Sequence, residues 1–182
     1  MTQLSYTPRA DYALLIPKTT ITTGVASFSV SLAGYDYKDL LIRMALRDSA
    51  NASGVTSWTF KPFTSGTYAG KYLTDIITST VTPAVAYAKQ DAAVNIPLGF
   101  TMGTGAAAGL FGHYEIEILN ADDASNKYGY ARLNTYENNS SAAHWNTVMW
   151  LSTDTIACDG FSVGSGAALT VANCWYEVYR TR

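Results

Sequence analysis

Hydrophobic and polar residues alternate with a period of two along much of this chain, beginning at Ile21 and continuing through GVASFSVSL. Such alternation places successive side chains on opposite faces of an extended strand, so one face is buried and the other meets water. The segment YKDLLIRMALR has the same pattern and predicts that Leu40, Ile42, Met44 and Leu46 face the core. The pattern favours strands over helices in this part of the chain.

The alternation is strongest in HYEIEIL, where Tyr114, Ile116 and Ile118 share one face and Glu115 and Glu117 share the other. An Asp-rich turn, NADDASNKYG, follows this strand. The stretches YGYARLNT, WNTVMWLS, TIACDGFSVG and LTVANCWYEVY predict further strands. Roughly eight to ten short strands, about ten residues apart and separated by turn residues, are typical of a β-sandwich or jelly roll.

Two parts of the chain give a different signal. In SWTFKPF, Pro62 interrupts ladder pairing and places the aromatic strand near a sheet edge. We assign Trp58 of this strand, and Trp150 further on, to the hydrophobic core. Residues 64–110 contain short β-branched runs broken by prolines, and one short helix around residues 84–93 is an alternative to a strand there.

The N-terminal stretch MTQLSYTPRADYALLIPK has Pro8 and Pro17 on either side of an aromatic and aliphatic cluster. This composition suits an extended arm laid over a neighbouring subunit. We therefore predict an all-β protein with an extended N-terminal arm at residues 1–18 and a single β-sandwich or jelly-roll-like domain at residues 19–182. The residues predicted to contact a partner are those of the arm that would fill pockets on another subunit, namely Tyr6, Tyr12, Leu14 and Leu15.

Composition and charge exclude several partners. Hydrophobic residues make up 48% of the chain and charged residues only 14%, against roughly 25% in an average globular protein. The net charge of −2 comes from thinly spread residues without a run of like charge, so we expect no nucleic-acid binding. The chain has no apolar run of membrane-spanning length and no signal-peptide pattern at its start, so we expect no membrane partner and synthesis in the cytoplasm.

Few residues carry the chemistry of an active site. His113 and His144 are the two histidines, and neither accompanies a GxSxG nucleophile motif. Glu115 and Glu117 project from one strand face about 7 Å apart, a separation that a glycosidase pair can use. Adjacent acids on the wet face of a strand are more often solvent-facing, and we interpret these two in that way. We expect no catalytic residues and no enzyme activity.

The sequence also contains no clear motif for a metal site or a redox site. Asp122, Asp123 and Asn126 bring oxygen ligands together, but without the spacing of a calcium-binding EF-hand, which favours a plain turn. Cys158 and Cys174 do not form a CxxC pair, and we interpret them as buried small apolar residues. We expect no metal site and no cofactor.

Three stretches, in this order, resemble a loose group of tailed-bacteriophage virion proteins: GYDYKDLLIRMALRDSANASG, FKPFTSGTYAGKY and AGLFGHYEIEILN. In that group a G-[YF]-x-x-L-x-I strand leads through a Ser/Ala loop to an aromatic strand and a Gly-x-x-Tyr turn, and a Gly-Phe-Gly later precedes an I-x-I strand ending in Asn. The closing stretch WLSTDTIACDGFSVGSGAALTVANCWYEVYR resembles the last two strands of the group. The matching positions are Gly34, Leu40, Ile42, Phe60, Gly66, Tyr68, Phe111, Gly112, Ile116, Ile118, Asn120, Trp150, Thr153, Ile156, Phe161 and Tyr176.

Two positions depart from the group. Lys61 and Pro62 stand where many members have Asn-Asp, and the usual final Leu-Tyr-Gly-Ile is here Trp-Tyr-Glu-Val. The resemblance implies a non-enzymatic structural protein of the virion. Within that class the leading expectation is a capsid decoration or cement protein that binds the outer surface of the major capsid shell as a trimer and stabilises it. Its partners would be its own copies and the major capsid protein or another virion subunit.

Two alternatives remain open at this point. One is a tail or head-fibre component that contacts the host. The other is a carbohydrate-binding β-sandwich module, with Trp58, Trp145 and Trp175 as candidates for a platform that stacks on sugar rings. Several of the thirteen tyrosines, including Tyr128, fall near turns or on polar faces and suit either a protein interface or sugar stacking.

Overall fold

The computed structural model describes residues 11–49, 55–64, 70–79, 84–93, 95–102, 111–137, 142–164 and 170–181. These residues form twelve strands and no helix, which confirms the all-β prediction. The first six strands are β1 (Ala13–Thr20), β2 (Ser27–Ser31), β3 (Leu40–Leu46), β4 (Val55–Lys61), β5 (Gly70–Ser79) and β6 (Ala84–Ala93). The last six are β7 (Ile96–Met102), β8 (Gly112–Leu119), β9 (Tyr128–Glu137), β10 (Ala142–Ser152), β11 (Gly160–Gly164) and β12 (Trp175–Arg180).

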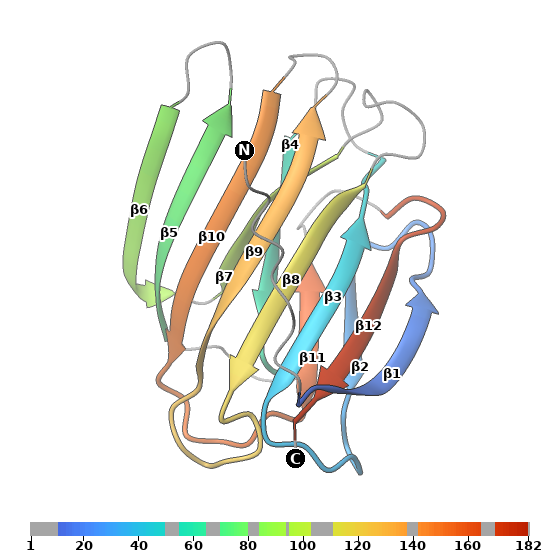
Figure 1. The fold of residues 1–182 in the computed structure, drawn as a ribbon, viewed down its shortest axis with the longest axis vertical. Helices are drawn as coiled ribbons and strands as arrows, with labels where there is room; N and C mark the ends of the chain where they lie inside the picture. Colours follow the sequence, from blue (N-terminus) through green and yellow to red (C-terminus); the bar gives the residue numbers. More distant parts are fainter. Residues whose placement is uncertain are drawn as a thin grey trace.

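The strands form two antiparallel sheets packed together as a β-sandwich (Figure 1). The larger sheet has eight strands in the order β1-β12-β3-β8-β9-β10-β5-β6, and the smaller has four in the order β2-β11-β4-β7. In the smaller sheet, β7 lies against β8, β9 and β10. The β5–β6 hairpin extends beyond the smaller sheet at the left of Figure 1. The larger sheet therefore has an inner face toward the core and an outer face, which is turned away from the smaller sheet.

The core lies between the sheets and consists of the residues that the alternation assigned to it. Ile42 and Met44 of β3 and Tyr114, Ile116 and Ile118 of β8 are buried there. Large side chains fill the space between the layers, because aromatic rings bury much apolar area per residue. The ring of Phe60 lies 6.5 Å from that of Trp150 and 6.1 Å from that of Phe161, measured between centroids. Trp58 and Trp150 are both buried, as predicted.

Strand β3 is more buried than the alternation predicted. Leu41 and Ala45 lie on its outer face, yet neither is exposed. Arg43 between them is only partly exposed. Part of the outer face of the larger sheet is therefore covered, and Tyr12, which immediately precedes β1, contributes to this cover.

Two expectations about strands are wrong. Residues 84–93 form the strand β6, paired with β5, and not a helix. The strand β4 lies between β11 and β7 in the interior of the smaller sheet, because it ends at Lys61, before Pro62 interrupts pairing. Nothing in the described residues forms a helix long and apolar enough to cross a membrane.

The predicted boundary between arm and domain at residue 18 falls inside a strand. Residues 13–20 form β1, which pairs with β12 at one edge of the larger sheet. Residues 13–18 of the predicted arm thus belong to the sandwich. Residues 1–10 lie outside the described residues.

Candidate interaction surface

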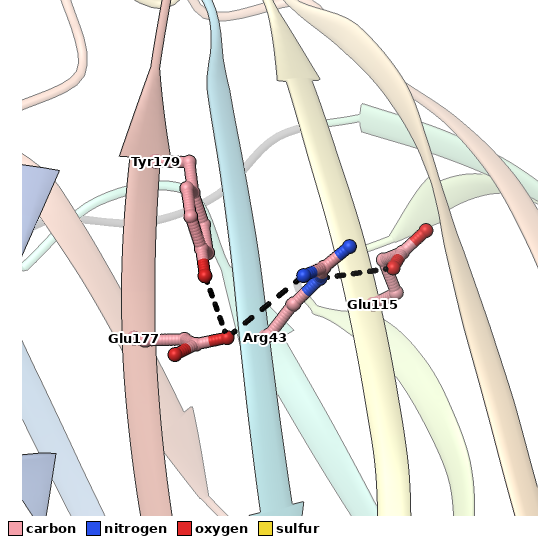
Figure 2. Close-up of polar contacts among 4 residues, drawn as sticks. All are labelled: Arg43, Glu115, Glu177 and Tyr179. Carbon is pink, nitrogen blue, oxygen red and sulfur yellow. Dashed lines mark hydrogen bonds and ion pairs between the residues drawn. The ribbon is translucent and has the colours of Figure 1, made fainter. Parts of the chain in front are cut away.

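The outer face of the larger sheet carries a row of charged residues, one from each of three neighbouring strands. Arg43 on β3 is paired in register with Glu177 on β12 and with Glu115 on β8. Its Nε lies 3.2 Å from Glu115 Oε2, and its Nη1 lies 4.0 Å from Glu177 Oε1 (Figure 2). We call Glu177, Arg43 and Glu115 the charged row. Opposite charges directly across a sheet stabilise the pairing of the strands.

Tyr179 completes this arrangement. Its hydroxyl donates to Glu177 Oε1 over 3.0 Å, and the Arg43 guanidinium lies 5.2 Å from the centre of its ring. Burial raises the pKa of the Tyr179 hydroxyl, and the hydrogen bond to the Glu177 carboxylate raises it further. Tyr179 therefore stays a neutral hydrogen-bond donor. The charged row is partly exposed, so each ion pair contributes at most about 1 kcal/mol.

Glu117 lies on the same face but is buried, with 2% of its surface exposed. The hydroxyl of Tyr12 donates to Glu117 Oε1 over 2.6 Å. Tyr12 comes immediately before β1, so the chain at this point lies over the outer face at β8. Sequence analysis placed Glu115 and Glu117 on one face correctly, but both carboxylates have partners within the chain. Glu115 contacts Arg43, and Glu117 contacts Tyr12.

The four residues predicted to contact a partner differ in their exposure and in their contacts within the chain. Tyr12 is partly buried and bonded to Glu117 of its own sheet. Leu15 is partly buried and packs against the core, so it supports the fold. Leu14 is 55% exposed on β1 and remains accessible to a partner. Tyr6 lies outside the described residues.

We expect the contact between Tyr12 and Glu117 to stabilise the sandwich. Replacing Tyr12 with Phe removes the hydroxyl and leaves a buried carboxylate oxygen without its donor. Hydrogen bonds to charged groups contribute about 1.5–3 kcal/mol, so the free energy of unfolding in urea should fall by about that amount. Tyr35→Phe is the matched control, because Tyr35 is 49% exposed. Equal stability of the two variants would contradict this role for Tyr12.

An exposed apolar patch adjoins Glu117 on the outer face. From Glu117 the register runs through Tyr130 on β9 and Met149 on β10 to Leu73 on β5. Leu151, two residues after Met149, is paired with Tyr128. We define the apolar patch as the exposed large residues of these strands, with exposed fractions of 42% for Leu73, 47% for Tyr128, 57% for Met149 and 36% for Leu151.

Clustered exposed apolar side chains on a soluble protein mark sites of protein interaction. Sequence analysis singled out Tyr128 but missed the other three. The signal was present in WNTVMWLS, where Asn146, Val148 and Trp150 are buried on the inner face and the alternate positions are also apolar at Met149 and Leu151. A strand that is apolar on both faces indicates either a covered outer face or a docking surface.

The histidines are separated by a strand. His113 on β8 is paired with Ala45 and Asn134, whereas His144 on β10 is paired with Thr78 and Thr135. Partial burial lowers the pKa of His113, and the nearby charge of Lys18 lowers it further. Strand β9 lies between the two histidines.

The loop between β8 and β9 is built around an internal cation. The side chain of Lys127 is fully buried, and its Nζ donates to the backbone carbonyls of Asp123 over 2.9 Å and Ser125 over 3.1 Å. Burial lowers the pKa of Lys127, while Asp123, Asp154 and other neighbouring acidic groups act in the opposite direction. Lys127 thus donates hydrogen bonds to backbone carbonyls of the same loop in which Asp122, Asp123 and Asn126 were weighed as calcium ligands. Among the residues that the structure describes, no three His, Cys, Asp or Glu side chains are grouped to hold a metal.

Both cysteines are buried and unpaired, as predicted. Cys158 Sγ lies 2.7 Å from the carbonyl oxygen of Pro62 and 2.9 Å from that of Gly160, and burial raises its pKa to about 12. A thiol with this pKa stays protonated at neutral pH, so it is a poor nucleophile.

The three tryptophans considered as a sugar-binding platform differ in how far they are buried. Trp58 is fully buried, so it is not available to stack on a ligand. Trp175 is partly buried, and Lys18 Nζ lies 4.4 Å from the centre of its ring. The side chain of Trp145 lies outside the described part of the structure.

Comparison with known proteins gives no relative for this chain. No family model matches it, and neither a curated protein nor a solved structure matches it significantly. The geometry of the outer face is therefore the main guide to function.

Proposed function

We propose that this chain is a non-enzymatic structural subunit of a tailed-bacteriophage virion, and specifically a capsid decoration protein that binds the outer surface of the major capsid shell. The observation that carries the proposal is the apolar patch on the outer face. The sandwich already buries a core between its sheets, so the exposed Leu73, Tyr128, Met149 and Leu151 are available to a protein partner. The resemblance of the sequence to tailed-bacteriophage virion proteins suggests that this partner is another virion subunit.

The chemistry of the face suits a structural contact. Burying an exposed leucine or methionine stabilises a complex by about 1–3 kcal/mol. In the charged row beside the patch, Arg43 lies between two carboxylates, so each carboxylate has a positive charge beside it, although one arginine and two glutamates leave the row with a net charge of −1. Closed symmetry is the default for homo-oligomers, and a trimer matches the local threefold sites of an icosahedral shell. Three patches per trimer would then act together through multivalency.

The test is binding to capsid shells of the virus that encodes the chain, measured as protein per shell after sedimentation. We expect the double variant Met149→Ser with Leu151→Ser to lose about 2 kcal/mol or more of binding free energy, which lowers the affinity over tenfold. Ile156→Ser is the matched control, because Ile156 is 58% exposed and lies outside the strands. Circular dichroism verifies that each variant is folded.

Unchanged occupancy of the double variant would refute the assignment of the patch. If the unmodified protein does not sediment with the shells at all, the capsid role itself is refuted. Light scattering coupled to size exclusion measures the mass of the free protein, for which the proposal expects a trimer.

A further inference from the structure

The two sheets of the sandwich have four edges, formed by β1 and β6 in the larger sheet and by β2 and β7 in the smaller. An edge strand presents unpaired backbone N–H and C=O groups, and proteins protect such edges with prolines, bulges or short strands. An edge with a longer regular stretch than the other three would be distinguished as a place where another strand binds.

Three edges are protected. Strand β1 contains Pro17, and its pairing with β12 is interrupted by register shifts between Leu14 and Ile16 and between Ile16 and Thr19. Strand β7 contains Pro97 and a register shift in its pairing with β4. Strand β2 is only five residues long.

Strand β6 has charged residues at Lys89 and Asp91, but it differs from all three in the length of its regular stretch. It is ten residues long and contains no proline. Residues 84–90 are paired with β5 without interruption, from Ala84 opposite Thr78 to Gln90 opposite Tyr72, and the one register shift comes after Gln90. Among the described residues, no strand is paired with the other side of β6. Within the part of the chain that the structure describes, residues 84–89 therefore have no neighbouring strand on the side away from β5, where alternate backbone N–H and C=O groups point.

The position of β6 leaves space for a partner strand. The β5–β6 hairpin extends beyond the smaller sheet, so β6 lies at the far side of the sandwich from β1 and β12 (Figure 1). A strand added here would continue the larger sheet outward from the molecule.

We propose that β6 pairs with β6 of a second copy of this chain, antiparallel and across a twofold axis at Tyr87. A twofold contact uses the same surface on both copies, and an antiparallel strand pair satisfies this symmetry with a single edge. With the axis at Tyr87 the whole regular stretch is paired, because Ala84 lies opposite Gln90 and Ala86 opposite Ala88. The two larger sheets then form one continuous sheet.

The sequence of β6 suits this register. Three of the seven residues, Ala84, Ala86 and Ala88, have small side chains, which allow close approach between the copies. The only charged residue of the stretch, Lys89, lies opposite Val85 of the second copy, so the two lysines are kept apart. Like charges directly opposite each other destabilise a strand pair.

This pairing goes beyond the proposed capsid role and uses a different surface from the apolar patch. It predicts that copies associate in pairs, so the mass of the free protein is an even multiple of the chain. A dimer is expected if the trimer does not form, and a hexamer if both contacts form.

The first experiment compares Tyr87→Lys with Ile156→Lys by light scattering across a wide range of protein concentration. Tyr87→Lys places two positive charges opposite each other at the axis, and we expect it to halve the mass. Ile156→Lys adds the same charge away from the edge and should leave the mass unchanged. A wild-type protein that is monomeric or trimeric at every concentration, or a Tyr87→Lys variant with the wild-type mass, overturns the pairing.

The second experiment uses disulfide cross-linking and does not depend on the lysine variant folding. Residues directly opposite in an antiparallel pair have Cα atoms about 4.5–5.5 Å apart, within the range that a disulfide bridges. We expect Tyr87→Cys to form a covalent dimer under mild oxidation. Val85→Cys is the control, because two copies of residue 85 would lie about 14 Å apart. The native Cys158 and Cys174 are buried in both variants. Equal cross-linking of the two variants overturns the register.

The outcomes separate this inference from the capsid role. A dimer that is cross-linked at residue 87 but does not bind shells supports the pairing and refutes the capsid role. A trimer that binds shells and is not cross-linked supports the capsid role and refutes the pairing.

Discussion

Replacing Gly129 with alanine is expected to destabilise the sandwich severely. Gly129 lies on β9, paired with Ile118 of β8 and Trp150 of β10. A Cβ at this position would fall directly against the backbone carbonyl oxygen of Glu117 and 2.9 Å from Cζ2 of Trp150. Overpacking a core costs about 1–3 kcal/mol and occasionally more. The backbone of a central strand cannot move aside as a flexible side chain can, so we expect a loss at or above the upper end of that range.

The measurement is the midpoint of urea unfolding followed by far-ultraviolet circular dichroism. Gly164→Ala is the matched control, because Gly164 also lies in a strand, and a Cβ there would be 3.4 Å from Ser27 Cβ, an ordinary contact. We expect the control to unfold close to the wild-type midpoint and Gly129→Ala to unfold far below it or to be recovered unfolded. Equal midpoints for the two variants would show that β8 and β9 are not packed as described.

Alternation predicted the strands of this protein well wherever one face is buried and the other is polar. HYEIEIL is such a case, and β8 has Tyr114, Ile116 and Ile118 in the core. The pattern failed for AVAYAKQDAA because alanine, lysine and glutamine favour helices in isolation. Seven consecutive pairs with β5 outweigh that preference in β6. Tertiary pairing of this kind leaves no mark on the local sequence.

The arm boundary was misplaced for a related reason. Alternation is lost in ALLIPKTT because β1 carries two register shifts and Pro17. A shift moves the following residues to the other face, so the period of two is interrupted although the strand continues. The segment therefore has the sequence pattern of an irregular arm while its backbone pairs with β12.

The outer face was only partly predictable. Sequence alone placed Glu115 and Glu117 on one face, because that depends on spacing within one strand. The contacts of Glu115 with Arg43 and of Glu117 with Tyr12 span 72 and 105 residues, respectively. They depend on the order β1-β12-β3-β8 in the sheet, which alternation does not encode. The apolar patch needs the same information, since Leu73 and Met149 are neighbours only because β5 is paired with β10.

Trp58 provides the second large effect. Its side chain is fully buried on β4, in the interior of the smaller sheet. Truncation of a buried tryptophan to alanine costs about 3–5 kcal/mol, because transfer energy is lost and a cavity remains. We therefore expect Trp58→Ala to lower the free energy of unfolding by that amount, measured by urea unfolding with circular dichroism as the probe.

Trp58→Phe is the informative comparison. Within the described part of the chain, no hydrogen-bond acceptor contacts the buried Nε1 of Trp58. An unsatisfied buried donor costs about 1–3 kcal/mol, and phenylalanine removes that donor while it keeps an aromatic ring in the core. We expect the loss for Trp58→Phe to be well below that for Trp58→Ala. Similar losses for the two variants would mean that the N–H has a partner in solution. A loss below about 1 kcal/mol for Trp58→Ala would contradict the burial of Trp58 and return it to the candidates for a sugar-binding surface.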